Sequence, residues 1–194
     1  MSEKVVARPV QQVLELVRDR GDEDALTDLE VTWTYRDLAA HAAGVAAHLD
    51  SQPGDSMIGL LADRRVASVA AVFGSLWAGR GWVLVDAREA PDRLAEMFER
   101  AGVGAVVDAT GTVTGRIGNL EVQPLPPAVP NDADWPSPRT VDAAARCTVQ
   151  FTSGSTGRPK GVIKSFGTFN RIVDAFGEHT EFLARKRSAV FMPL

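Results

Sequence analysis

The feature that most constrains the fold is an alternation of short apolar runs and helix-spaced apolar stripes in the middle of the chain. Apolar runs at 57–61, 82–85 and 104–107 each have the length of a buried strand. Stripes with helical spacing lie between them, over 66–77 and 91–101. Because strand–helix–strand units connect parallel strands, the pattern predicts an α/β fold with a largely parallel sheet flanked by helices.

Residues typical of helix ends flank these stripes. Asp63 is a candidate N-cap for the helix over 66–77, since a carboxylate accepts hydrogen bonds from free N–H groups of a first turn. Gly79 and Gly81 are expected to end that helix, and Pro91 favours the start of the next one.

The first third of the chain predicts two helices separated by a short hairpin. The first helix is expected to end before Gly21, and the hairpin is expected over 26–35, which is rich in β-branched and aromatic residues. Thr34 and Asp37 have the spacing of a capping box at the start of the second helix. The first helix carries its apolar stripe at Val10, Val13, Leu14 and Val17.

This first third does not predict a metal site. The acidic run at 22–24 is more typical of a solvated turn than of a metal-binding cluster. His41 and His48 are two helical turns apart, ~10 Å along the axis, which is too far for one metal ion. Both histidines are therefore interpreted as incidental, and the tryptophans, Trp77 and Trp82 among them, as packing residues.

Prolines interrupt the pattern between Gly111 and Asp142, where six of them accumulate. Proline disfavours both a continuing helix and a central strand, so this stretch predicts a long connection. We expect an N-terminal α/β subdomain over 1–122, a proline-rich connection over 123–143, and a following incomplete α/β unit over 144–194.

Composition excludes several classes of protein. The chain has 194 residues, is 45% hydrophobic and has a formal net charge of −4, so its surface as a whole is not that of a nucleic-acid-binding protein. Cys147 is the only cysteine, which excludes an internal disulfide framework and predicts a reducing compartment, the cytoplasm. No stretch reaches the ~18 uninterrupted apolar residues of a membrane span, and no secretory signal is predicted.

The segment predicted to carry chemistry follows a short strand over 147–151. Glycines let backbone N–H groups converge on one point, hydroxyls add donors, and Lys160 adds a positive charge, so the segment can wrap a polyphosphate. It begins with six consecutive small or hydroxyl residues, Thr152, Ser153, Gly154, Ser155, Thr156 and Gly157.

Charge supports this interpretation, although composition alone also fits a flexible linker. No Asp or Glu occurs between Asp142 and Asp174, so an anion would be drawn to this stretch. The spacing excludes a Walker loop because Gly161 follows Lys160 where that motif has a hydroxyl residue, and the dinucleotide fingerprint is also missing. The basic residues in the interval are Arg146, Arg158, Lys160, Lys164 and Arg171.

The loop over 152–161 resembles the phosphate-binding loop of the adenylate-forming superfamily, which includes adenylation domains of nonribosomal peptide synthetases and acyl-CoA synthetases. Residues 32–38 resemble the family's threonine–tyrosine–acid–leucine helix start. The stretch from Met57 to Asp86 resembles its strand, helix, Ala-Gly turn and strand. The likeness covers about 25–194, and it implies the N-terminal subdomain of the adenylate-forming fold, in truncated form.

The resemblance implies that the loop holds the β- and γ-phosphates of ATP while a substrate carboxylate attacks the α-phosphorus. The product is an acyl-adenylate, whose acyl group then passes to a thiol of carrier-protein phosphopantetheine or CoA. Hydroxyls of Thr152, Ser153, Ser155 and Thr156 would donate to phosphate oxygens. Gly154 and Gly157 would permit close approach, and Lys160 would offset charge.

The resemblance also implies what this chain lacks. The family's magnesium ligand, ribose contact, acid pocket and C-terminal lysine have no counterpart here, so Mg²⁺ is expected to be held outside this chain. We expect little adenylation by the chain alone. We also expect an apolar surface on a helix over 166–176 and an open sheet edge at a strand over 189–192, which a complementary chain or self-association would cover. The residues of the loop slightly favour an amino acid over a fatty or aryl acid as the substrate. The alternative to an enzyme is a noncatalytic binding or scaffolding module.

Overall fold

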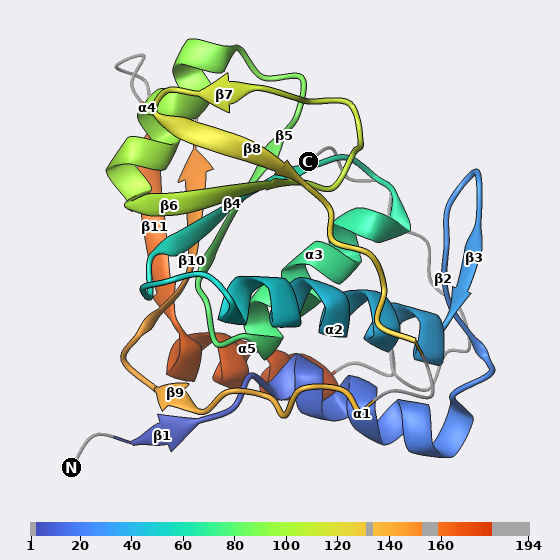
Figure 1. Cartoon of the computed structure of the whole chain (residues 1–194). Helices are drawn as coiled ribbons and strands as arrows, with labels where there is room; N and C mark the ends of the chain where they lie inside the picture. The colour runs from blue at the N-terminus through green and yellow to red at the C-terminus, as the bar shows by residue number, and fades with distance from the viewer. Residues whose placement is uncertain (1–2, 131–133, 153–158, 180–194) are drawn as a thin grey trace.

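The structure is a computed structural model, and it describes residues 3–130, 134–152 and 159–179. Two layers of helices enclose a central sheet (Figure 1). The helices are α1 (Arg8–Arg20), α2 (Tyr35–Asp50), α3 (Val66–Trp77), α4 (Pro91–Ala101) and α5 (Phe166–His179). The strands of the central sheet are β4 (Met57–Ala62), β5 (Trp82–Asp86), β6 (Val103–Asp108), β7 (Arg116–Ile117), β8 (Leu120–Pro124), β10 (Arg146–Thr152) and β11 (Lys160–Ser165).

Within the described ranges the sheet has seven strands in the order β11-β10-β5-β4-β6-β8-β7. The five inner strands, from β10 to β8, run parallel to one another, and the two outer pairs are antiparallel. The predicted α/β class with a largely parallel sheet is therefore confirmed, with one antiparallel strand added at each edge.

Two small ribbons lie outside this sheet. In the first, β2 (Asp24–Thr27) pairs with β3 (Thr32–Thr34), which confirms the predicted hairpin. In the second, β1 (Lys4–Val5) pairs with β9 (Val141–Asp142), joining the start of the chain to the segment just before β10. Figure 1 shows the β2–β3 hairpin standing at the side of the molecule and β1 and β9 beneath the helices.

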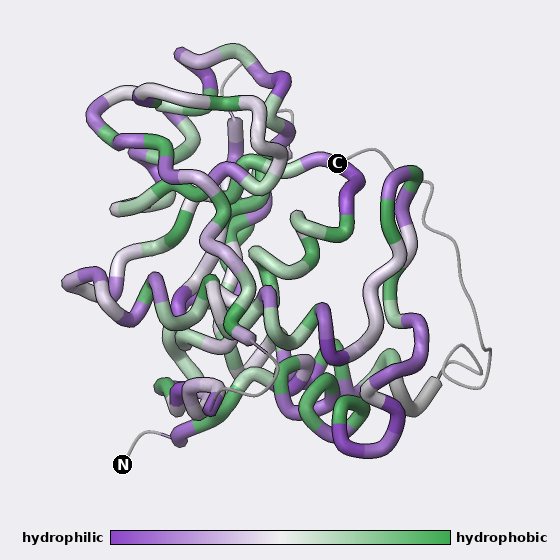
Figure 2. Tube along the Cα trace, turned by 45° about the vertical axis from the view of Figure 1, so that its right-hand side comes forward, coloured by the Kyte–Doolittle hydropathy of each residue, from purple (hydrophilic) through white to green (hydrophobic). Residues whose placement is uncertain are grey.

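The sheet is buried on both faces, which explains why its strands are continuously apolar. Leu60 belongs to a core cluster that includes buried residues of α1, α2, α3 and α5, whereas its neighbour Leu61 belongs to a second cluster that includes those of α4. Neither side chain is exposed. Figure 2 shows hydrophobic stretches along the strands and hydrophilic ones in the outer turns. Gly74 lets α2 and α3 approach closely, because a Cβ there would lie 2.4 Å from the Cβ of Val45.

The start of α2 has the predicted capping box. The Asp37 amide donates to Thr34 Oγ1 at 3.1 Å, and the Thr34 amide donates to Asp37 Oδ2 at 2.9 Å. Each bond satisfies a backbone N–H that the helix itself leaves without a partner.

The predicted N-cap of α3 was wrong. Arg65 holds the N-cap position, and the Asp63 carboxylate instead accepts a bond from the Arg65 amide at 2.9 Å. The first N–H of the helix, at Val66, donates to Asp28 Oδ2 at 2.9 Å. Asp28 lies in the turn of the β2–β3 hairpin, so tertiary contact supplies the acceptor that a local residue was expected to supply.

The proline-rich connection runs along α2 and α3. The Val129 amide donates to the Ala40 carbonyl at 3.0 Å, and the Arg139 amide donates to the Trp77 carbonyl at 2.9 Å. The Trp77 indole N–H donates to the Pro136 carbonyl, and its ring meets the ring of Trp135 edge-on at 6.2 Å. Trp77 and Trp82 are buried, which confirms that these two tryptophans pack in the core.

The two histidines have separate contacts. His41 stacks on Trp33 with ring centroids 4.0 Å apart, and burial lowers the pKa of His41. His48 Nε2 contacts Gln123 Oε1 at 2.7 Å. Among the described residues no group of three or more His, Cys, Asp or Glu side chains is placed to hold a metal, and no helix is long and apolar enough to cross a membrane.

Asp28 provides a test of how the hairpin stabilises α3. Its carboxylate accepts from the amides of Val66, Glu30 and Val31, and these bonds lower its pKa below 3.8. Asp28→Ala should lower the free energy of unfolding by about 1–2 kcal/mol at neutral pH, measured by urea denaturation. Asp19→Ala, on the exposed side of α1, is the control and should have little effect.

The difference between Asp28→Ala and the unaltered protein should depend on pH. Because the pKa of Asp28 is lower in the folded than in the unfolded state, its carboxylate contributes fully above pH 3.8. The contribution is lost as the pH falls through the folded-state pKa, so the two unfolding curves should converge in acid. A difference that stays constant with pH would contradict the role of the Asp28 charge.

Candidate functional site

The segment predicted to carry chemistry lies at the carboxyl edge of the parallel strands. β10 pairs in parallel with β5 through Thr148 and Trp82, and it ends at Thr152. β4 and β5 end at the same edge, where Ala62 is the register partner of Asp86. Ligands of open α/β sheets bind at this edge.

An antiparallel hairpin brings the two described ends of the predicted loop together. β10 and β11 pair from Arg146 and Ser165 to Thr152 and Lys160, and the Thr152 hydroxyl donates to the Lys160 carbonyl at 3.4 Å. Thr152 and Lys160 are both exposed. Of the predicted site residues, the structure thus places these two directly opposite each other.

The other predicted site residues lie outside the described part of the chain. They are Ser153, Gly154, Ser155, Thr156 and Gly157, and Arg158 lies there with them. Their roles stay predictions, as does the binding of a polyphosphate by the whole loop.

Alternation along the two strands places the side chains of Thr152 and Lys160 on one face of the hairpin. Gln150 and Lys164 share that face, and the Lys164 ammonium donates to Gln150 Oε1 at 2.5 Å. Lys164 is therefore held against its neighbouring strand, four residues from Lys160. Gln150 was not among the predicted site residues, although two-residue alternation with Thr148 and Thr152 places it on this face.

Gly161 explains how β11 can lie close to β10 beside Lys160. A Cβ at Gly161 would lie 2.9 Å from Val149 Cγ1 and 3.3 Å from Phe151 Cε1. Both contacts are on the face that carries α4. A larger residue would push the strand outward one position after Lys160, so packing requires a glycine here, which is also part of the loop sequence.

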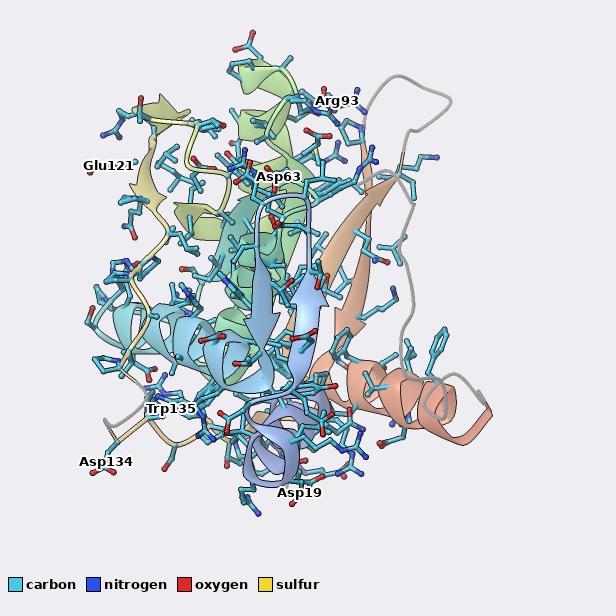
Figure 3. The ribbon with its side chains drawn as sticks, turned by 90° about the vertical axis from the view of Figure 1, so that its right-hand side faces the viewer. Asp19, Asp63, Arg93, Glu121, Asp134 and Trp135 are labelled. Carbon is cyan, nitrogen blue, oxygen red and sulfur yellow. The ribbon has the colours of Figure 1, made fainter. Side chains whose placement is uncertain are left out.

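Two carboxylates at this edge, those of Asp86 and Asp63, are paired with arginines. Arg88 donates through Nη2 and Nε to the Asp86 carboxylate, and these bonds lower the pKa of Asp86 to about 2. Arg65 pairs with Asp63 at 3.2 Å. Figure 3 shows Asp63 beside the tip of the β2–β3 hairpin.

Lys160 differs from these arginines. In the described ranges, the ion pairs do not include Lys160. The exposed Lys160 side chain thus differs from Arg65 and Arg88, which pair with the carboxylates of Asp63 and Asp86 at this edge.

A cavity of about 180 Å³ lies on the opposite face of the hairpin, between the hairpin and the end of α4. Arg100 and Arg146 line it together with apolar residues of both strands. The Arg146 Nη1 group donates to the Ala101 carbonyl at 3.0 Å, so this arginine closes the C-terminal end of α4. The cavity is separated from Thr152 and Lys160 by the sheet.

Apolar side chains are exposed on β11 and α5, although Phe166, the first residue of the predicted apolar stripe, is buried. The strand predicted over 189–192 lies outside the described residues. Val162 and Ile163 are 50% and 58% exposed, and Phe176 is 67% exposed. β11 is also the last strand of the sheet within the described residues. What covers this surface stays a prediction.

Comparison with known proteins agrees with this geometry. The family model described as AMP-binding enzyme matches residues 14–194. The chain therefore belongs to the family of AMP-binding enzymes, the adenylate-forming superfamily that the loop sequence predicted.

Similar curated proteins include synthetases and a carrier-protein ligase. The chain is 33% identical over 164 residues to tyrocidine synthase 3 of Brevibacillus parabrevis, covering 80% of this chain and 2% of that protein. It is 30% identical over 149 residues to the D-alanine–D-alanyl carrier protein ligase of Lactiplantibacillus plantarum, covering 74% and 29%. The chain thus spans a small part of the length of these relatives.

Solved structures show the same fold. VinN in complex with 3-methylaspartate superposes with a TM-score of 0.73 at 19% identity, over 95% of this chain and 53% of that one. The O-succinylbenzoate coenzyme A synthetase of Bacillus subtilis, in complex with AMP, gives 0.69 at 20% identity, over 92% and 47%. These likenesses confirm the fold of the N-terminal part of adenylate-forming enzymes.

Proposed function

We propose that the β10–β11 hairpin binds the triphosphate tail of ATP through its loop, with Thr152 and Lys160 at the base. The observation that carries this proposal is the direct pairing of Thr152 with Lys160 at the carboxyl edge of the parallel strands. In this position one hydroxyl and one ammonium group lie on the same face at the two ends of a glycine-rich loop. A polyphosphate is the anion that such a loop fits best.

The reaction we propose is activation of a carboxylic acid as an acyl-adenylate. A carboxylate is ionised at neutral pH, so its attack on the α-phosphorus needs alignment and charge compensation rather than a general base. Lys160 would compensate the charge that develops on the departing pyrophosphate. The Ser153, Ser155 and Thr156 hydroxyls would add donors around it.

We propose an amino acid as the substrate. The acceptor of the acyl group would be the phosphopantetheine thiol of a carrier protein or, alternatively, the thiol of CoA. Support comes from the relatives, which include a nonribosomal peptide synthetase and a D-alanine–D-alanyl carrier protein ligase. We propose that the ligand of Mg²⁺ lies outside this chain, as the resemblance implies.

Lys160→Ala tests the phosphate site. Removing the ammonium group should weaken binding of inorganic triphosphate at least tenfold, since charge-assisted bonds to phosphate contribute about 1.5–3 kcal/mol. Titration calorimetry at low salt measures the affinity. Lys164→Ala is the matched control, because it removes the same charge from the same strand and face about 13 Å from Lys160. Equal losses in both variants would indicate nonspecific attraction and contradict the proposal.

We also propose that the 194-residue chain does not complete adenylation by itself. The resemblance places the contacts to ribose and magnesium and the C-terminal lysine in segments without a counterpart here, so the transition state would lack most of its contacts. Pure chain should therefore bind triphosphate without catalysing exchange of labelled pyrophosphate into ATP. Exchange that depends on a carboxylic acid would overturn this expectation, and it would also exclude the noncatalytic binding module.

A further inference from the structure

Residues 3–8 contact the chain on both sides of the β10–β11 hairpin, at β9 before it and at α5 after it. They precede the part of the chain that the family model matches, which begins at residue 14. The proposed phosphate site gives them no role. Their contacts are nevertheless long-range, since they connect residues more than 130 positions apart. Figure 1 shows β1 and α1 below α5.

The first contact is with the segment that leads into β10. Lys4 and Val5 of β1 pair with Asp142 and Val141 of β9. The Ala143 amide donates to the Glu3 carbonyl at 2.8 Å. The chain start thus forms a short ribbon with the residues just before the hairpin.

The second contact is with the helix that follows β11. The Arg8 amide donates to Asn170 Oδ1 at 2.8 Å, and Asn170 Nδ2 donates to the Val6 carbonyl at 2.8 Å. One side-chain amide of α5 therefore bonds to the backbone on both sides of buried Ala7. Arg8 Nε also donates to Asp174 Oδ1 at 2.9 Å, one turn further along α5.

The start of α5 is fixed to the same region. The amides of Phe166 and Gly167 donate to the carbonyls of Ala145 and Ala143 at 2.9 and 2.8 Å, and the Phe166 side chain is buried. Since α5 begins directly after β11, these bonds and those of Asn170 hold the far end of the strand whose near end carries Lys160. Within the described residues β11 pairs with β10 alone, so these bonds are its main further restraint against local opening there.

From this arrangement we infer that Asn170 is a positioning residue for the phosphate site, acting as the centre of a clamp between residues 6–8 and α5. The inference rests on the proposed function, because the group it positions is Lys160 on β11. When the clamp is lost, α5 and β11 separate more often from β10. The fraction of molecules with an intact hairpin then falls, and the apparent affinity for the anion falls with it.

Asn170→Ala is the primary test because it removes both side-chain bonds and replaces asparagine by a better helix former. If Asn170 served only as a residue of the helix, this substitution would make α5 more stable. If it forms the clamp, α5 becomes less stable, and hydrogen exchange of the amides in 160–176 rises about tenfold from the loss of two bonds. Inorganic triphosphate affinity should fall about threefold. Asn170→Asp keeps the acceptor for the Arg8 amide and should recover part of both effects.

Controls separate the clamp from global stability and from the proposed function. Ala175→Ser, at an exposed position of the same helix, should leave both exchange and affinity unchanged. If the clamp acts through residues 6–8, deleting residues 1–8, which removes both bonding partners of Asn170, should have effects at least as large as those of Asn170→Ala. Adding Asn170→Ala to the deletion should then change little further. Additive effects would overturn the clamp.

The outcomes distinguish the two proposals. Unchanged exchange in Asn170→Ala, or raised exchange with unchanged triphosphate affinity, would overturn the positioning role while the phosphate site stands. Failure of the unaltered protein to bind triphosphate would overturn the proposed function, and with it the role of Asn170 in binding. In that case the exchange data would still report whether the two bonds hold α5.

Discussion

Parallel pairing of β10 with β5 is the interaction on which the rest of the structure depends. Thr148 lies opposite Trp82 there, and this contact joins the hairpin to the sheet that residues 57–124 build. It aligns the end of β10 with the ends of β4 and β5. The loop after β10 therefore opens at the edge where α/β sheets bind ligands, rather than elsewhere on the surface.

Local patterns predicted most of the fold because its parallel strands are buried on both faces. Apolar runs such as the one from Met57 to Ala62 and helix-spaced stripes are local signals, and the capping box at Thr34 is also local. The N-cap of α3 was not predictable in this way, because Asp28 lies 38 positions before Val66. The contact of Asn170 with Arg8 spans 162 positions, and no spacing rule reports it. The loop was identified from its sequence, while the structure describes only Thr152 and residues 159–161 of it.

Charge pairing explains how an acidic chain can offer a site for an anion. The total charge is −4, and aspartates follow or end several of the parallel strands. Arg88 neutralises Asp86 and Arg65 neutralises Asp63, so the edge is less negative than its sequence suggests. Asp108 is buried and accepts bonds from the amides of Thr110 and Val113. The local field at the end of β10 is then set largely by the basic residues of the hairpin.

Mapping of backbone amide chemical shifts during titration with inorganic triphosphate tests the central claim most directly. The account predicts saturable shifts that are largest at Thr152 and Lys160, with little change at Gly81 on the opposite edge of the sheet. Shifts that are largest at that opposite edge or in the Arg100–Arg146 cavity, or that do not saturate, would contradict it.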